Sequence, residues 1–135
     1  MKTLIVEDEL TSRALLRELL KRYGVPQIAM NGREAVDAVR AALAAGEPYD
    51  LICLDIMMPE MDGQEALRQI RQLEQESGAG ADEQKRAKVI MTTALSDRDT
   101  VLESMKSQAD YFLVKPIDAR ALIEGLRRLG LLPRM

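Results

Sequence analysis

The chain lacks histidine and tryptophan altogether and contains a single cysteine among its 135 residues. The absence of histidine excludes a histidine-ligated zinc site, a Ser-His-Asp triad and any phosphohistidine formed on this chain. A single cysteine excludes an intramolecular disulfide, so a reducing cytoplasm is the simplest expected location. Aromatic residues make up only 3% of the chain, which argues against a surface on which nucleobases stack.

Charge and hydropathy exclude two further classes of protein, those that bind nucleic acids and those that span a membrane. Nineteen basic and 22 acidic side chains give a net charge of −3, so the basic surface that nucleic-acid binding requires is missing. No apolar run approaches the ~20 residues that cross a bilayer, and the N-terminus does not resemble a signal peptide. We therefore expect one globular domain over residues 1–135, with no attached output domain and neither a membrane nor a nucleic acid as partner.

Five short apolar runs alternate with longer amphipathic segments. The runs are Thr3–Val6, Gln27–Met30, Leu51–Leu54, Lys88–Thr92 and Tyr111–Val114. Their length and near-continuous apolar character predict strands that are buried on both faces of a parallel sheet.

The intervening segments have helical spacing and recognisable ends. Asn31, Asp62, Asp97 and Asp118 precede apolar stripes as N-caps, and Gly24 stands where a left-handed C-cap is expected. Strand and helix repeated five times predict an open, doubly wound parallel α/β sheet with helices on both faces. The polar stretch Gln75–Arg86 is interpreted as a helix end followed by a solvated connector, and its function stays open.

Chemically useful side chains follow four of the five predicted strands. Glu7, Asp8 and Glu9 follow the first strand, Asp55 the third, Thr93 the fourth and Lys115 the fifth. In doubly wound sheets the carboxyl ends of the strands form the site, so we expect these groups to converge. Crowded carboxylates favour a hard divalent cation such as Mg²⁺. With Asp55 as nucleophile, the set fits in-line phosphoryl transfer to a carboxylate.

Each of these residues also has a purely structural interpretation. The run Glu7–Glu9 fits a helix N-terminus, where acids gain ~0.3–1 kcal/mol from the helix dipole. Asp55 fits a turn cap, and Lys115 fits a surface lysine with a buried stem. The functional interpretation is favoured because all of them occur together, each at the end of a different strand.

Four motifs in order resemble the receiver domain of bacterial response regulators. They are Val6–Glu9, Leu54–Gly63, Thr93–Ala94 and Lys115–Pro116, and the resemblance covers residues 2–130. It implies a flavodoxin-like fold with strand order 2-1-3-4-5 and a role in two-component phosphorelay signalling. It also implies a phosphoacceptor domain rather than an enzyme, one that assists its own phosphorylation and slow autodephosphorylation.

The resemblance implies a role for each acidic residue. Asp55 would accept a phosphoryl group from a phosphohistidine on a sensor histidine kinase or a histidine phosphotransfer protein. Mg²⁺, or Mn²⁺, would be held by Asp8, Asp55 and the backbone carbonyl of Met57, with Glu7 acting through water. The resemblance places Glu9 outside this set.

The resemblance also implies how the site signals. Thr93 and Lys115 would bind the phosphoryl group, and Thr93 with the aromatic Phe112 would switch the domain. Strand alternation separates Phe112 from Tyr111, although Phe112 also fits a core position. The bond before Pro116 is expected to be cis. The output of the domain would be a contact with another protein through the face formed between residues 97 and 129. The chain would be a monomer, or a dimer that forms after phosphorylation.

Two apolar residues suggest a slow loss of the phosphoryl group. Met57 and Leu95 lie two residues beyond Asp55 and Thr93, and in receiver domains these positions flank the path of the hydrolytic water. We hypothesise that they fail to orient this water and so tune dephosphorylation.

Other functions remain open at this point. The alternatives are a phosphorylation-independent interaction module and a receiver cut from a longer regulator or hybrid kinase. An aspartyl-phosphate phosphohydrolase would need a second aspartate at Met57, and a flavin or nucleotide domain would need a glycine-rich loop after the first strand. The downstream partner is not indicated by the sequence.

Overall fold

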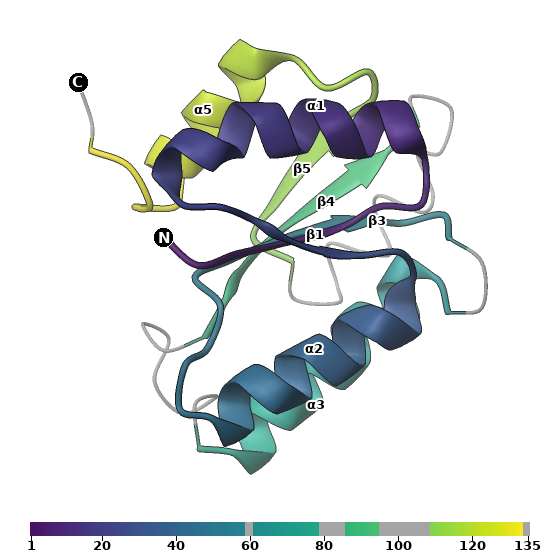
Figure 1. The fold of residues 1–135 in the computed structure, drawn as a ribbon, viewed down its shortest axis with the longest axis vertical. Helices are drawn as coiled ribbons and strands as arrows, with labels where there is room; N and C mark the ends of the chain where they lie inside the picture. Colours follow the sequence, from purple (N-terminus) through teal and green to yellow (C-terminus); the bar gives the residue numbers. More distant parts are fainter. Residues whose placement is uncertain (59–60, 79–85, 95–108, 134–135) are drawn as a thin grey trace.

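The structure is a computed structural model that describes residues 1–58, 61–78, 86–94 and 109–133 (Figure 1). Five strands form one parallel sheet in the order β2-β1-β3-β4-β5, as the resemblance implied. The strands are β1 (Thr3–Val6), β2 (Gln27–Ala29), β3 (Leu51–Asp55), β4 (Lys88–Thr93) and β5 (Tyr111–Val114).

Three strand ends differ by one residue from the predicted runs. β2 ends at Ala29 rather than Met30, whereas β3 and β4 each extend one residue further. Asp55 and Thr93 are therefore the last residues of their strands, and their backbones are held by the sheet. Polar character at these positions had suggested that the strands end earlier.

Helices cover both faces of the sheet. α1 and α5 lie on one face, and α2 and α3 lie on the other (Figure 1). The helices are α1 (Leu10–Leu20), α2 (Gly32–Ala44), α3 (Gly63–Glu76) and α5 (Ala119–Arg128), and a 3-10 turn over Lys21–Tyr23 follows α1. The predicted helix that begins after Asp97 lies outside the described residues.

The two faces of the sheet contribute to separate cores, because alternate residues of a strand point to opposite sides. Ile5, Cys53 and Leu113 pack with the α1 and α5 side. Leu4 and Leu54 pack with the α2 and α3 side. The sheet is thus buried on both faces, as its near-continuous apolar strands predict.

Side-chain caps begin the helices as expected. Asn31 accepts a hydrogen bond from the backbone N–H of Glu34, Asp62 from that of Glu65, and Asp118 from that of Ala121. These bonds satisfy N–H groups that the first helical turn leaves unpaired. Each cap therefore fixes where its helix leaves the carboxyl edge of the sheet.

The predicted left-handed cap at Gly24 is wrong. α1 tightens into the 3-10 turn, and Gly24 then adopts φ 125° and ψ 142°, which is positive in φ but extended in ψ. A Cβ atom on this glycine would lie 2.4 Å from the carbonyl oxygen of Met1. Glycine is therefore required here by the close approach of the N-terminal backbone as well as by φ.

A buried ionic network joins α3 to β4 and β5 far from the carboxyl edge. Arg71 contacts Glu74 at 2.6 Å and Asp110 at 2.9 Å, and it donates to the carbonyl of Ala87. Asp110 also accepts from the backbone N–H of Val89 at 2.8 Å. The network compensates the burial of the arginine and fixes where β4 and β5 begin.

Candidate functional site

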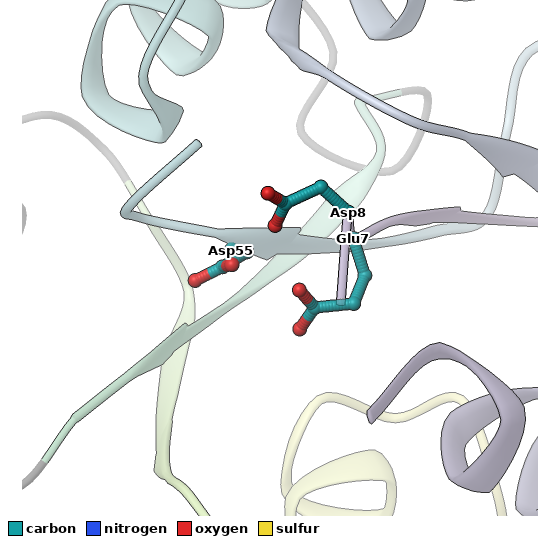
Figure 2. A group of neighbouring side chains, drawn as sticks. All are labelled: Glu7, Asp8 and Asp55. Carbon is teal, nitrogen blue, oxygen red and sulfur yellow. The ribbon is translucent and has the colours of Figure 1, made fainter. Parts of the chain in front are cut away.

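Three carboxylates meet at the carboxyl edge of the sheet. Glu7 and Asp8 directly follow β1, and Asp55 ends β3; one oxygen from each lies within 4.8 Å of the others. Figure 2 shows the three carboxyl groups turned toward a common region, with Glu7 and Asp8 extending to either side of the chain. Glu7 and Asp55 are buried, whereas Asp8 is exposed. The edge therefore carries a strongly acidic cluster, called the acidic pocket below, that is exposed to solvent at Asp8.

Lys115, which follows β5, reaches both buried carboxylates. Its Nζ lies 2.6 Å from Glu7 Oε1 and 3.2 Å from Asp55 Oδ2. Burial of Glu7, partly opposed by the hydrogen bond from Lys115 and reinforced by nearby Asp55, raises the pKa of Glu7 to about 7. Burial lowers the pKa of Lys115, but the hydrogen bond that its ammonium donates to Glu7 and the charge of Asp55 outweigh this effect, so the pKa of Lys115 is raised.

Glu9 is separated from this cluster by its role in α1. Its carboxylate accepts from the backbone N–H groups of Thr11 at 2.9 Å and of Ser12 at 2.6 Å. Hydrogen bonds from Ser12 and Thr11 lower the pKa of Glu9 to about 2. Of three consecutive acidic residues, one therefore caps the helix and two line the pocket. The interpretation of this run as a helix N-terminus holds only for Glu9.

Thr93 ends the strand next to that of Asp55, and Met57 follows Asp55 by two residues. Thr93 is buried at the end of β4, and its hydroxyl donates to the carbonyl of Ala94 at 3.3 Å. The backbone N–H of Met57 donates to Asp55 Oδ1 at 3.3 Å, and its side chain is 65% exposed. Leu95, the other residue expected beside the hydrolytic water, lies outside the described residues.

The two aromatic residues of β5 lie on opposite faces, as strand alternation predicts. Phe112 packs against the core under α2 and α3, and Tyr111 against the core under α1 and α5. Phe112 is partly buried, so both its switch role and its core role remain compatible with its position. The Lys115–Pro116 peptide bond is cis, which agrees with what the resemblance implies.

The start of α3 is seated against the backbone of Asp55. The N–H of Gly63 donates to the carbonyl of Ile56 at 2.8 Å. A Cβ atom on Gly63 would lie 2.2 Å from the carbonyl oxygen of Asp55. Only glycine allows this approach, so Gly63 determines how closely the helix supports the acidic pocket.

Comparison with known proteins decides the family. Residues 3–127 match the response regulator receiver domain. The chain belongs to this family. Chemotaxis protein CheY of Thermotoga maritima is 31% identical over 96% of this chain and 97% of its own length. The receiver domain is thus a phosphoacceptor signalling domain of two-component phosphorelays.

Other relatives are much longer. A probable histidine kinase 2 of rice is 35% identical over 93% of this receiver domain, which spans only 12% of that kinase. Among solved structures, the complex of the Saccharomyces cerevisiae phosphotransfer protein Ypd1 with the receiver domain of Ssk1 matches with a TM-score of 0.80. The two sequences are 28% identical, and the match covers 96% of this chain and 88% of the chain in the solved structure.

Thr92 is a second hydroxyl residue at the carboxyl edge, and it was not among the predicted site residues. It lies next to Thr93 in a strand that is otherwise apolar after Lys88, and this pair of polar residues was the available signal. Alternation places Thr92 on the face of the sheet opposite to Thr93. Its surroundings are therefore those of Lys115 rather than those of Phe112.

Within the described part of the chain, no helix combines the length and apolar character needed to cross a membrane.

Proposed function

We propose that Asp55 is the phosphoacceptor of this receiver domain. The main support is the position of Asp55: its buried carboxylate lies at the end of the central strand, 3.2 Å from the Lys115 ammonium and beside two further acidic groups. In the transfer, an Asp55 oxygen forms a bond to phosphorus while the P–N bond of a phosphohistidine breaks. The departing imidazole nitrogen takes up a proton, so no other reactant is required.

The donor set fits a hard divalent cation. All three groups offer oxygen, and Asp8 keeps the pocket open to solvent. Mg²⁺, or Mn²⁺, would be held by Asp8, Asp55 and the Met57 backbone carbonyl, with Glu7 acting through water. When bound, the ion would offset the negative charge that gathers as a phosphoryl group approaches a carboxylate.

Lys115 and Thr93 would bind the phosphoryl group. The ammonium of Lys115 already lies against Asp55, where it would neutralise a phosphoryl oxygen. Among the described residues, the hydroxyl of Thr93 makes one 3.3 Å contact, to the carbonyl of Ala94, and it would turn from there toward a new acceptor. We propose that this turn, together with a movement of Phe112, changes the face between residues 97 and 129 that binds a downstream protein.

The phosphodonor would be a histidine kinase or a histidine phosphotransfer protein. Such a donor must approach Asp55 from the open side of the pocket. Large apolar side chains are exposed near this side: Leu10 is 68% exposed, Met57 65% and Met30 41%. An apolar helix surface that carries the donor histidine would bury them. The Ssk1 receiver in complex with the phosphotransfer protein Ypd1 supports this class of partner.

Phosphotransfer from a P–N donor tests the proposal. The receiver domain is incubated with phosphoramidate and Mg²⁺, and acid-labile phosphate on the protein is measured for wild type and for Asp55→Asn. We expect incorporation in wild type only, and none after chelation of the metal. Equal incorporation in the variant would move the acceptor elsewhere, and no incorporation in either folded protein would favour a phosphorylation-independent interaction module.

A further inference from the structure

Thr92 carries a hydroxyl that the resting site does not use. Its side chain is buried, with a relative exposure of 1%. Its Oγ1 atom has no hydrogen-bond partner in the part of the chain that the structure describes. A buried hydroxyl without a partner is destabilising, because water would otherwise satisfy it. Valine has the same shape without this cost, so the presence of threonine calls for a physical reason.

The register of the sheet locates this hydroxyl. Thr92 pairs with Asp55 of β3 on one side and with Leu113 of β5 on the other. Paired residues of neighbouring strands point to the same face of a sheet. Leu113, and Ile90 two residues before Thr92, both pack on the α1 and α5 side. Thr92 therefore points to that side, in the same row as Asp55.

Lys115 has to cross β4 to reach its partners. It follows β5, and its backbone N–H donates to the carbonyl of Thr93 at 2.8 Å. Its ammonium nevertheless contacts Asp55, on the far side of β4, and Glu7 beyond it. Because Asp55 is in register with Thr92, the side chain ends in the row of Thr92. The register thus places Thr92 in the row of the sheet that the Lys115 side chain crosses on its way to Asp55.

An ammonium group has three N–H donors, and the contacts to Glu7 and Asp55 account for two of them. We propose that Thr92 is a positioning residue for Lys115. Its Oγ1 accepts a hydrogen bond from the ammonium when Lys115 turns from Glu7 to a phosphoryl group on Asp55. This inference rests on the proposed function, and it assigns to the two adjacent threonines different partners on opposite faces.

The test compares stability and anion binding in the two states. Thr92→Val removes the hydroxyl with little change in shape, and Thr92→Ser keeps it. Thermal and urea unfolding are measured by circular dichroism without ligand and with Mg²⁺ plus beryllofluoride, a non-covalent mimic of the phosphoryl group. The same titrations give the apparent affinity for beryllofluoride, and the NMR signal of the Lys115 side chain is followed in each state.

Thr3→Val is a matched control. Thr3 is also 1% exposed, and its hydroxyl likewise has no hydrogen-bond partner in the described structure. It begins β1, at the end of the sheet remote from the pocket. Loss of its hydroxyl changes the same buried chemistry without touching the path of Lys115.

Opposite effects in the two states are expected for Thr92→Val. The variant is at least as stable as wild type without ligand, yet it binds beryllofluoride about tenfold more weakly, the value of one hydrogen bond to a charged group. Thr92→Ser restores the affinity, Thr3→Val leaves it unchanged, and the Lys115 signal of the bound state shifts only in Thr92→Val.

Two results overturn the inference alone. One is a clear loss of stability in unliganded Thr92→Val, because it means that the hydroxyl already has a partner at rest. The other is wild-type affinity for beryllofluoride in Thr92→Val. If wild type itself fails to bind beryllofluoride with Mg²⁺, the proposed function falls and the inference falls with it.

Discussion

The ammonium of Lys115 lies closer to Glu7 than to the proposed phosphoacceptor Asp55, at 2.6 Å against 3.2 Å. Glu7 is fully buried, and its second oxygen accepts from the backbone N–H of Glu9 at 3.1 Å. Both of its oxygens are therefore engaged inside the protein. We therefore keep the proposal that Glu7 would act on a cation through water, with Asp8 and Asp55 as the direct ligands.

Removal of Lys115 should leave two neighbouring buried carboxylates uncompensated. We expect Lys115→Met to lower the free energy of unfolding at pH 8. The loss should fall below the ~3–5 kcal/mol of a fully buried pair, because water still reaches part of the lysine. Mg²⁺ should recover part of it. Urea unfolding followed by circular dichroism measures both effects, with Lys88→Met at the opposite end of β4 as the control. An unchanged stability at pH 8 would contradict the assigned ion pairs.

The raised pKa of Glu7 predicts how stability depends on pH. A carboxyl group with a folded-state pKa of about 7 against an ordinary 4.5 binds its proton more tightly when folded. Its contribution is complete below pH 4.5 and is lost as the pH rises through 7. The free energy of unfolding should therefore fall between pH 5 and 8, and Glu7→Gln should reduce this fall.

Glu9→Gln supplies the control for this pH dependence. The lowered pKa of Glu9, about 2, gives stability that is present above pH 4.5 and lost as the pH falls through 2. Its replacement should leave the slope between pH 5 and 8 unchanged. A slope that responds to Glu9→Gln and not to Glu7→Gln would reverse the two assignments.

Adjacent acidic residues should differ sharply in their effect on cation binding. Asp8→Ala should weaken Mg²⁺ binding about tenfold or more, since it removes a direct ligand. Glu9→Ala should barely change Mg²⁺ binding but should lower Tm by a few degrees through loss of the α1 cap. Calorimetric titration and thermal unfolding separate the two. Equal losses of Mg²⁺ affinity in Asp8→Ala and Glu9→Ala would contradict the assignment of Asp8 as a ligand and of Glu9 as a helix cap only.

Much of this site can be predicted from the sequence, because its residues directly follow strands that the sequence itself reveals. Strand ends are visible as apolar runs that stop at a polar residue. The predicted meeting of Asp8, Asp55 and Lys115 is therefore found in the structure, and the approach of Thr93 to Asp55 stays a prediction. Composition and spacing alone do not show that Asp8 belongs to the acidic pocket and that Glu9 caps α1, because three consecutive acids are equally suited to a helix start. This division depends on the backbone direction after β1.

The neighbours of Lys115 could not be predicted for a different reason. Its contacts with Glu7 and Asp55, across β4, depend on the lateral order of strands and on how far a side chain reaches. Both are tertiary properties that the polarity of Thr92 does not reveal. The network around Arg71 is similar, since its partner Asp110 is 39 residues away.

Gly63 should be intolerant of any side chain. Gly63→Ala places a Cβ atom 2.2 Å from the Asp55 carbonyl oxygen, so the helix start or the strand end must move. We expect a loss of ~1–3 kcal/mol in unfolding free energy together with weaker Mg²⁺ binding. Gly125→Ala, which meets the Tyr111 ring at 2.7 Å, should lose stability but keep Mg²⁺ affinity. Normal Mg²⁺ binding by Gly63→Ala would disprove the supporting role of α3.

Met57 should slow the loss of the phosphoryl group. Its exposed side chain stands two residues after Asp55 and offers no polar atom to orient water. Met57→Asn supplies such a group, and we expect autodephosphorylation several-fold faster than in wild type. Met30→Asn, at an exposed methionine that directly follows β2, is the control. Decay of acid-labile phosphate after donor removal gives the rates, and unchanged decay in Met57→Asn would refute the hypothesis.

The most direct measurement is the intact mass of the protein after incubation with acetyl phosphate, with and without Mg²⁺, for wild type and Asp55→Asn. The account predicts a gain of one phosphoryl group that requires Mg²⁺ and is absent from the variant. A folded wild-type protein that gains no mass, or a variant that gains the same mass, would contradict the assignment of Asp55 as the phosphoacceptor.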